Sequence, residues 1–274
     1  MEKATINGIE LAYEVKGSGE PVLLIATGPI ADSFLPFLSE KVPTGNYRLI
    51  RYHQRGQVGS AKAAAPATFA EHAADAAALL HYLGIERAHV AGHSTGGLIA
   101  LQLASDFPEV VQSLALLEPL LMNVPGAGVF LEKAGPALAA YGAGDREGAM
   151  ATFLSVVCSL DWNTCRTTIE AQVPGGVAQA IQDADTVFAG YLPALQSWHF
   201  GASQAAAISR PVLSVLGTES ERLFAEGRNL LHTWFPQVED STIEGTGHLL
   251  HMQRPDPVAR EVTAFFGRHA LGVN

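Results

Sequence analysis

The stretch that decides the fold of this chain reads Val90-Ala91-Gly92-His93-Ser94-Thr95-Gly96-Gly97. It places a G-x-S-x-G pattern directly after an apolar run and directly before a helical pattern. A serine on such a strand-to-helix turn has a crowded backbone, and Gly92 and Gly96 remove side chains that would clash there. The turn pushes Ser94 Oγ clear of the sheet, and the helix N-terminus favours developing negative charge. The pattern predicts a nucleophile elbow; the alternative is a glycine-rich turn with an incidental serine.

Short apolar runs bounded by Gly, Pro or polar residues recur on both sides of the elbow. Such runs indicate strands buried on both faces of a parallel sheet, and they lie at 22–26, 47–52, 88–91, 114–117, 211–216 and about 238–243. Residues 4–15 alternate in polarity and predict one or two strands with a turn at Asn7-Gly8. Helical patterns lie between the runs, at 34–40, 68–83, 96–106, 220–234 and 256–268. This alternation indicates a doubly wound α/β sheet.

One long segment, residues 120–207, breaks this rhythm. It contains no clear buried strand, and its helical stretches lie at 129–141, 148–160 and 177–189. About 88 residues are too many for a simple crossover. We therefore expect a helical cap inserted over the edge of the sheet where open α/β sheets bind ligands. Residues 1–119 and 208–274 would then form the core.

Composition excludes several classes of protein. Apolar residues make up 48% of the 274 residues, which excludes intrinsic disorder. The formal net charge is −10 and no Lys/Arg cluster occurs, so we expect neither nucleic acid nor an anionic membrane as a partner. The N-terminus lacks the apolar region of a signal peptide, and no apolar run reaches the ~20 residues of a membrane span. A cytoplasmic protein is expected, and its oligomeric state, a homodimer included, stays open.

The two cysteines, Cys158 and Cys165, are too few for a disulfide framework or a four-thiolate metal site. On one helix they would lie too far apart to form a bridge. A turn at residues 161–163 would bring them together, so a bridge between them stays open.

A serine nucleophile needs a base, and His248 is the best placed of the ten histidines. It follows the expected last strand and precedes the last helix, and a serine well before the histidine suits this type of fold. His251 is the rival, with a helix cap or solvent exposure as its alternative. His93 is expected to be structural because it precedes the nucleophile. Most of the histidines in or beside helical patterns are expected at the surface; these are His72, His81, His89, His232 and His269.

Several motifs together show a resemblance to the α/β-hydrolase superfamily over essentially the whole chain. They are Gly92-His93-Ser94-Thr95-Gly96-Gly97, Tyr52-His53-Gln54-Arg55-Gly56, Gly245-Thr246-Gly247-His248, and Leu83-Gly84-Ile85-Glu86-Arg87-Ala88-His89-Val90 before the elbow. The resemblance implies an α/β-hydrolase fold with a mostly parallel, eight-stranded sheet flanked by helices. It also implies a cap inserted after the sixth strand and a Ser–acid–His triad.

The third member of that triad departs from the superfamily's usual pattern. The acid normally follows the seventh strand, where this chain has Ser220 within Gly217-Thr218-Glu219-Ser220-Glu221. The other known location is the end of the sixth strand, and Glu118 stands there between apolar runs. A buried carboxylate is costly without a partner, so we expect it to pair with His248. Glu219, Glu221 and a purely structural Glu118 remain alternatives. An acid after strand six looks like the arrangement in zearalenone-type lactone hydrolases, to which the similarity is looser.

The remaining parts of the site are an oxyanion hole and a pocket. The hole needs two N–H donors: Thr95 supplies one, and Gly28 or Ile30 the other, because Pro29 has none. The Thr27 hydroxyl is an additional candidate, and the alternative is a simple turn. Aromatic and apolar side chains that could line a pocket under the cap include Phe34, Met122, Phe130 and Trp198.

These residues predict a serine hydrolase that cleaves a small hydrophobic carboxylic ester or lactone through an acyl-enzyme. No metal or organic cofactor is implied. A C–C bond hydrolase or a perhydrolase would use the same Ser–His pair, and a non-catalytic binding protein on the same fold is a further alternative. Members of the superfamily that open epoxides or displace halides carry an aspartate at the elbow, so the resemblance together with Ser94 argues against both reactions.

Overall fold

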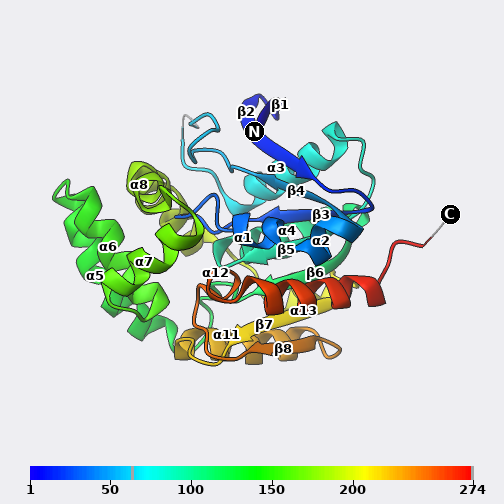
Figure 1. Ribbon diagram of the computed structural model, residues 1–274. Coiled ribbons are helices and arrows are strands. Elements are labelled where there is room, and N and C mark those ends of the chain that lie inside the picture. The colour runs from blue at the N-terminus through cyan, green and yellow to red at the C-terminus, as the bar shows by residue number, and fades with distance from the viewer. Residues whose placement is uncertain (63–64, 273–274) are drawn as a thin grey trace.

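An eight-stranded sheet forms the centre of the computed structural model, which describes residues 1–62 and 65–272 (Figure 1). The spatial order is β1-β2-β4-β3-β5-β6-β7-β8. The strands are β1 (Glu2–Ile6), β2 (Ile9–Lys16), β3 (Glu20–Ile25), β4 (Tyr47–Tyr52), β5 (Ala88–His93), β6 (Val111–Leu117), β7 (Val212–Gly217) and β8 (Glu239–Ile243). Strand β2 is antiparallel to its neighbours β1 and β4, and all other pairs are parallel. The mostly parallel, eight-stranded sheet is confirmed.

The turn between β1 and β2 is the one that the sequence predicts. Asn7 has a φ of 48° and Gly8 a φ of 79°. Positive φ at both central residues is the geometry that Asn-Gly favours in a two-residue hairpin.

Helices cover both faces of the sheet. Those at the expected positions are α1 (Leu35–Ser39), α3 (Phe69–Tyr82), α4 (Thr95–Asp106), α11 (Arg222–Trp234) and α13 (Pro255–Arg268). Three short helices were not anticipated: α2 (Lys41–Asn46), the 3₁₀ turn η1 (Pro108–Val110) and α12 (Leu250–Gln253). Thr68 and Glu71 form a capping box at the start of α3, a pairing for which Thr68 and a glutamate three residues later have the required spacing.

Alternate residues along a strand pack into two separate apolar cores, one on each face of the sheet. On β3, Leu23 belongs to the core shared with α3, α4 and α11, whereas Val22 and Leu24 belong to the core shared with α1 and α13. This alternation follows from the two-residue period of a strand. Because helices cover both faces of the sheet, both sets of strand side chains are apolar, and the strands therefore appear in the sequence as continuous apolar runs.

Only helices are found between β6 and β7. They are α5 (Ala127–Gly142), α6 (Arg146–Cys158), α7 (Trp162–Gln172), α8 (Gly176–Gln182), the π-helical segment η2 (Thr186–Tyr191), α9 (Leu192–Ser197) and α10 (Ala202–Ala206). Figure 1 shows α5 to α8 gathered beside one edge of the sheet. The helix expected at 177–189 is split into α8 and η2, and α7 was not anticipated. The division of the chain into a core and a lid stays a prediction.

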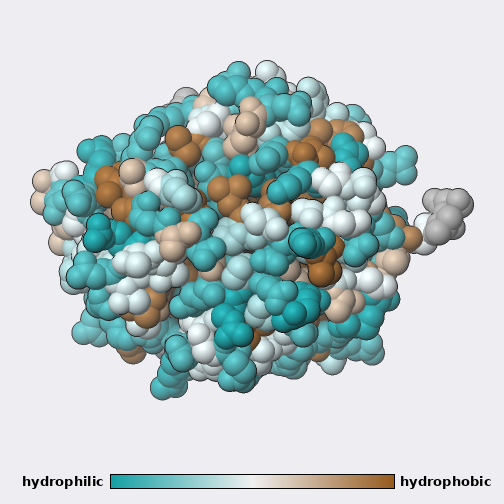
Figure 2. All heavy atoms as spheres, viewed as in Figure 1, coloured by the Kyte–Doolittle hydropathy of each residue, from teal (hydrophilic) through white to brown (hydrophobic). Residues whose placement is uncertain are grey.

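The molecular surface seen in Figure 2 is mostly hydrophilic, with apolar side chains in small groups. Across residues 1–62 and 65–272, none of the helices is long and apolar enough to span a bilayer.

Candidate active site

Ser94 lies on a strained turn between β5 and α4. Its φ is 55° and its ψ is −119°, which is uncommon for a residue with a side chain. The turn has no room for side chains beside it. A Cβ on Gly92 would lie 2.4 Å from Gly96 O, and a Cβ on Gly96 would lie 2.1 Å from Ile25 O. The two glycines of the motif therefore permit this backbone, and Ser94 is the side chain that the turn presents.

Glu118 follows β6, next to the elbow, and is only 2% exposed. Its backbone φ is 45°, another left-handed conformation at the same sheet edge. Oε2 lies 2.8 Å from His248 Nδ1. Oε1 accepts hydrogen bonds from the Gly217 N–H at 2.8 Å and from the Ser220 hydroxyl. Every oxygen of this buried carboxylate is therefore occupied by a donor.

The structure brings Glu118, and neither alternative acid, to His248. Glu221 accepts hydrogen bonds from Lys133 Nζ and the Ser159 hydroxyl, and these contacts lower its pKa. Glu219 is exposed. Ser220, at the position where the superfamily usually has its acid, donates to Glu118.

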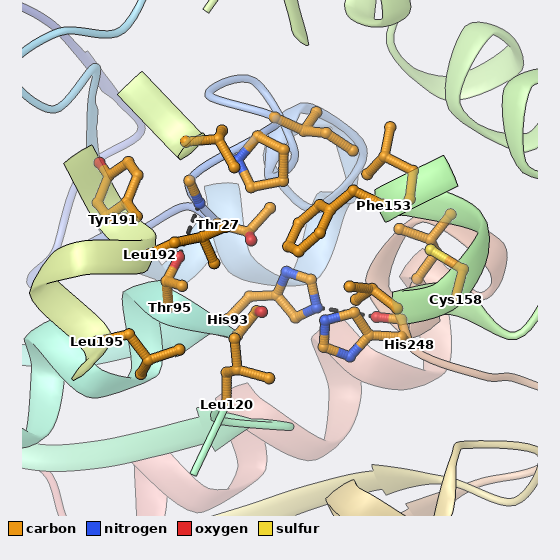
Figure 3. A pocket seen from close by; sticks show the side chains of 18 residues that line it. Thr27, His93, Thr95, Leu120, Phe153, Cys158, Tyr191, Leu192, Leu195 and His248 are labelled. Atoms are coloured by element: carbon orange, nitrogen blue, oxygen red, sulfur yellow. Dashed lines mark hydrogen bonds between the residues drawn. The ribbon is translucent and has the colours of Figure 1, made fainter. Parts of the chain in front are cut away.

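His248 is fixed on three sides. Its Nδ1 is held by Glu118, and Phe224 stacks on its ring with centroids 4.1 Å apart. His93 Nε2 donates to the His248 carbonyl oxygen at 2.8 Å. Within the part of the chain that the structure describes, His248 Nε2 is buried and has no hydrogen-bond partner. Ser94 and His248 line the same cavity, so this free nitrogen belongs to the site (Figure 3).

Two further histidines pack behind His248. The His93 ring lies 4.6 Å from the His248 ring and 4.3 Å from the His251 ring, centroid to centroid. Burial lowers the pKa of His93 well below its usual value and lowers that of His251 to about 3. Both rings therefore stay neutral at ordinary pH. The predicted cap or solvent position of His251 is wrong, because it is fully buried.

Surface positions were expected for most of the helix-associated histidines, and two of them are buried instead. His72 stacks on Tyr191, and burial lowers its pKa to about 3. His89 lies in β5 and stacks on Phe266. Both rings are buried by contacts with residues far away in the sequence, and the local sequence around a histidine does not indicate such burial.

The expected oxyanion residues, Gly28 and Thr95, lie together at the cavity, but they contact each other. The Gly28 N–H donates to Thr95 Oγ1 at 2.8 Å (Figure 3). The Thr95 N–H lies in the first turn of α4, where N–H groups have no partner within the helix. This arrangement leaves the Thr95 N–H, and not the Gly28 N–H, available to a ligand.

A group of residues that the sequence analysis missed holds the loop after β3. Gln57 Nε2 donates to the carbonyl oxygens of Thr27 and Gly28, and Gln54 Nε2 donates to that of Ala26. Tyr191 OH donates to Gln54 Oε1 at 2.5 Å. Of these residues, only Gln54 belongs to a motif recognised in the sequence, the one that ends at Gly56. That motif does not indicate a contact between Gln54 and η2.

A second, larger cavity of about 570 Å³ adjoins the first. Its lining includes Met122, Phe130 and Trp198, as the pocket prediction proposed. Phe153, Leu192 and Leu195 line both cavities and form the partition between them. The prediction for Phe34 is wrong: this side chain lines neither cavity and packs against His251 in the core below the site.

The two cysteines are free and buried. Cys158 lines the inner cavity. A hydrogen bond that the Cys158 thiol donates to Cys165, together with burial, raises the pKa of Cys158. Within residues 1–62 and 65–272, no group of three or more His, Cys, Asp or Glu side chains is placed to hold a metal ion.

Comparisons with known proteins agree with this architecture. The chain is 37% identical over 109 residues to a putative carbamate hydrolase RutD of Azorhizobium caulinodans. This match covers 39% of the chain and 40% of that protein. A putative non-heme bromoperoxidase BpoC of Mycobacterium tuberculosis is 36% identical over 110 residues, covering 40% and 42%. The chain thus matches less than half the length of these curated relatives.

Solved structures match over nearly the whole chain. An enol-lactonase from Burkholderia xenovorans superposes with a TM-score of 0.74 at 20% identity, over 97% of this chain and 100% of the other. A thermophilic esterase from Thermogutta terrifontis gives 0.74 at 23% identity, over 98% and 99%. These likenesses show a shared fold. The model of the alpha/beta hydrolase fold family matches residues 21–255, and the chain belongs to that family.

Proposed function

We propose that this protein is a serine hydrolase that cleaves a carboxylic ester or lactone through an acyl-enzyme. The observation that carries the proposal is the 2.8 Å hydrogen bond between His248 Nδ1 and Glu118 Oε2. It leaves His248 Nε2 as an acceptor in the cavity that Ser94 also lines. A nucleophile, a base and a group that orients the base are the three parts of such a site.

The steps follow from these positions. Ser94 Oγ attacks the substrate carbonyl while His248 Nε2 takes its proton, and Glu118 stabilises the imidazolium. His248 then returns the proton to the leaving alkoxide, which departs and leaves the acyl group on Ser94. Water, activated by the same histidine, releases the acid and regenerates the serine. His93 and His251 stay neutral behind His248, so they add no second positive charge that would oppose its protonation.

An apolar substrate fits the two cavities. The inner cavity is lined mainly by apolar side chains from the loop after β3, α6, η2 and α9. The outer cavity continues it past Phe153, Leu192 and Leu195 and adds Met122, Phe130 and Trp198. The carbonyl would lie beside Ser94, and an apolar chain would extend into the outer cavity. Residues 120–207 would then act as the lid that selects the substrate.

Labelling with a fluorophosphonate probe tests this function directly. The wild type should be labelled at Ser94 and should turn over p-nitrophenyl esters. Ser94→Ala should lose labelling and reduce kcat by several orders of magnitude with an unchanged circular dichroism spectrum, because the acyl-enzyme path is lost. Ester hydrolysis retained by Ser94→Ala would reject the mechanism. A wild type that is neither labelled nor active on esters would point to a binding protein on a hydrolase fold.

A further inference from the structure

The proposed chemistry needs two hydrogen-bond donors at the substrate oxygen, and the loop after β3 does not offer its usual backbone donor. In a nucleophile-elbow hydrolase the second donor is a backbone N–H from the loop after β3. Here that loop reads Thr27-Gly28-Pro29, and Pro29 has no N–H. The Gly28 N–H is already bonded to Thr95 Oγ1, at 2.8 Å and out of contact with solvent.

The Gly28 N–H is also prevented from turning toward the substrate. Gln57 Nε2 donates to the carbonyl oxygen of the Thr27–Gly28 peptide at 3.2 Å and to that of the following Gly28–Pro29 peptide at 2.9 Å. The Tyr191 ring covers Gly28 so closely that a Cβ there would lie 2.7 Å from Tyr191 Cδ2. Rotation of this peptide would break the Gln57 and Thr95 contacts together. We therefore treat the Gly28 N–H as an anchor of the loop.

Two candidate donors remain in this loop, the Ile30 N–H and the Thr27 hydroxyl, and the surroundings of Thr27 favour the hydroxyl. Thr27 lines the same cavity as Ser94, Thr95 and His248, and its side chain is 4% exposed. In Figure 3 it projects into the cavity beside Thr95. Of the hydrogen bonds among the described residues, those at Thr27 use its backbone and none uses its hydroxyl. Unlike His248 Nε2, the Thr27 Oγ1 keeps some accessible surface at the cavity, so a ligand bound there can reach this hydroxyl.

We propose that the Thr27 hydroxyl and the Thr95 N–H together form the oxyanion hole. The inference rests on the proposed serine mechanism. As Ser94 attacks, the carbonyl oxygen gains negative charge, and the Thr27 O–H and Thr95 N–H donate to it. Thr95 has a second task, because its own hydroxyl accepts the Gly28 N–H and fixes the loop that carries Thr27. Thr27 is thus a catalytic residue and Gly28 a positioning residue.

The test compares Thr27→Val, which keeps the shape and removes the hydroxyl, with Thr27→Ser, which keeps the hydroxyl. We expect kcat of Thr27→Val to fall by about 10²–10³-fold, the loss typical of one oxyanion donor, with KM little changed. Thr27→Ser should recover most of this loss. Binding of a boronic acid inhibitor should weaken in Thr27→Val, whereas the pH dependence of kcat should keep its midpoint. A purely structural effect of the substitution would not lower kcat and inhibitor binding while leaving KM and the pH midpoint unchanged. Thr27→Ala, expected to behave as Thr27→Val, covers the case in which the valine does not fold.

Thr95→Val tests the loop anchor, because it removes the acceptor of the Gly28 N–H and preserves the Thr95 backbone. We expect a loss of kcat smaller than that of Thr27→Val, because both proposed donors remain in the protein. If Thr27→Val and Thr27→Ala keep wild-type kcat, the inference is wrong. A gain of activity in Thr95→Val would then identify the Gly28 N–H as the donor, and no gain would leave the Ile30 N–H. Ser94→Ala separates this failure from a failure of the mechanism. An inactive Ser94→Ala beside a fully active Thr27→Val overturns only the role of Thr27, whereas an active Ser94→Ala overturns the serine mechanism itself.

Discussion

Replacing Glu118 with glutamine is the sharpest test of the proposed triad, because the structure fixes how the new amide must lie. Oε1 of Glu118 accepts from two donors, the Gly217 N–H and the Ser220 hydroxyl. An amide nitrogen in that position would face both donors. The glutamine oxygen will therefore take the place of Oε1, and its NH₂ group will replace Oε2 opposite His248 Nδ1.

This orientation reverses the hydrogen bond to the base. An NH₂ group can only donate, so His248 must present an unprotonated Nδ1 and carry its proton on Nε2. That tautomer cannot accept the Ser94 proton. The equivalent change in triad acids costs up to about 10⁴-fold in kcat, and we expect about 10²–10⁴-fold here. This range corresponds to about 3–5 kcal/mol of lost transition-state stabilisation.

Steady-state kinetics on a p-nitrophenyl ester would measure the loss, with circular dichroism as a control for folding. Ser220→Ala removes one donor but leaves the charge, so a loss of about 1 kcal/mol, less than tenfold in kcat, is expected. Glu219→Gln and Glu221→Gln should stay close to wild type because neither side chain contacts His248. Wild-type kcat in Glu118→Gln, together with a collapse in Glu219→Gln or Glu221→Gln, would refute this triad.

Two further predictions concern the cavities and pH. Phe153→Trp should narrow the passage between the inner and outer cavities. In a p-nitrophenyl ester series the preferred acyl chain should therefore become shorter, and an unchanged preference would show that the outer cavity does not hold the substrate. His251 has a pKa of about 3 when folded against a usual value of 6.5, so only the unfolded chain takes up this proton as the pH falls through that window. Stability should decline from about pH 6.5 downward by about 1.4 kcal/mol per pH unit for this proton. His251→Leu should flatten the decline between pH 4 and 7 in urea titrations without abolishing it, since His72 contributes similarly. Parallel curves for the two proteins would contradict the assignment.

Features that depend on neighbouring residues could be predicted from the sequence. The Asn7-Gly8 turn, the Thr68–Glu71 capping box and the turn at Ser94 each depend on backbone rules that act over a few residues. The sheet could be predicted for a related reason. Strands buried on both faces need continuous apolar runs, and such runs are visible in the chain.

Features that depend on distant contacts could not be predicted. The contact between Tyr191 and Gln54 joins residues 137 positions apart. The burial of His251 depends on Phe34 and His93, which lie far away in the sequence. Phe34 was misassigned for the same reason, since an aromatic side chain after β3 can face either the cavity or the core. Composition and periodicity do not distinguish these two directions.

The position of the acid shows how a sequence departure can be resolved by geometry. Strands β6 and β7 are parallel neighbours, with Leu117 paired to Val215, so their carboxyl ends meet at one edge of the sheet. A side chain from the end of either strand can therefore reach His248. Two carboxylates there would repel each other and raise one pKa, which would weaken the charge that supports the imidazolium. Ser220 avoids this repulsion and instead donates a hydrogen bond to Glu118. The serine at the usual acid position and the glutamate after β6 are thus two parts of one arrangement, and substitution of either residue should be interpreted with the other in view.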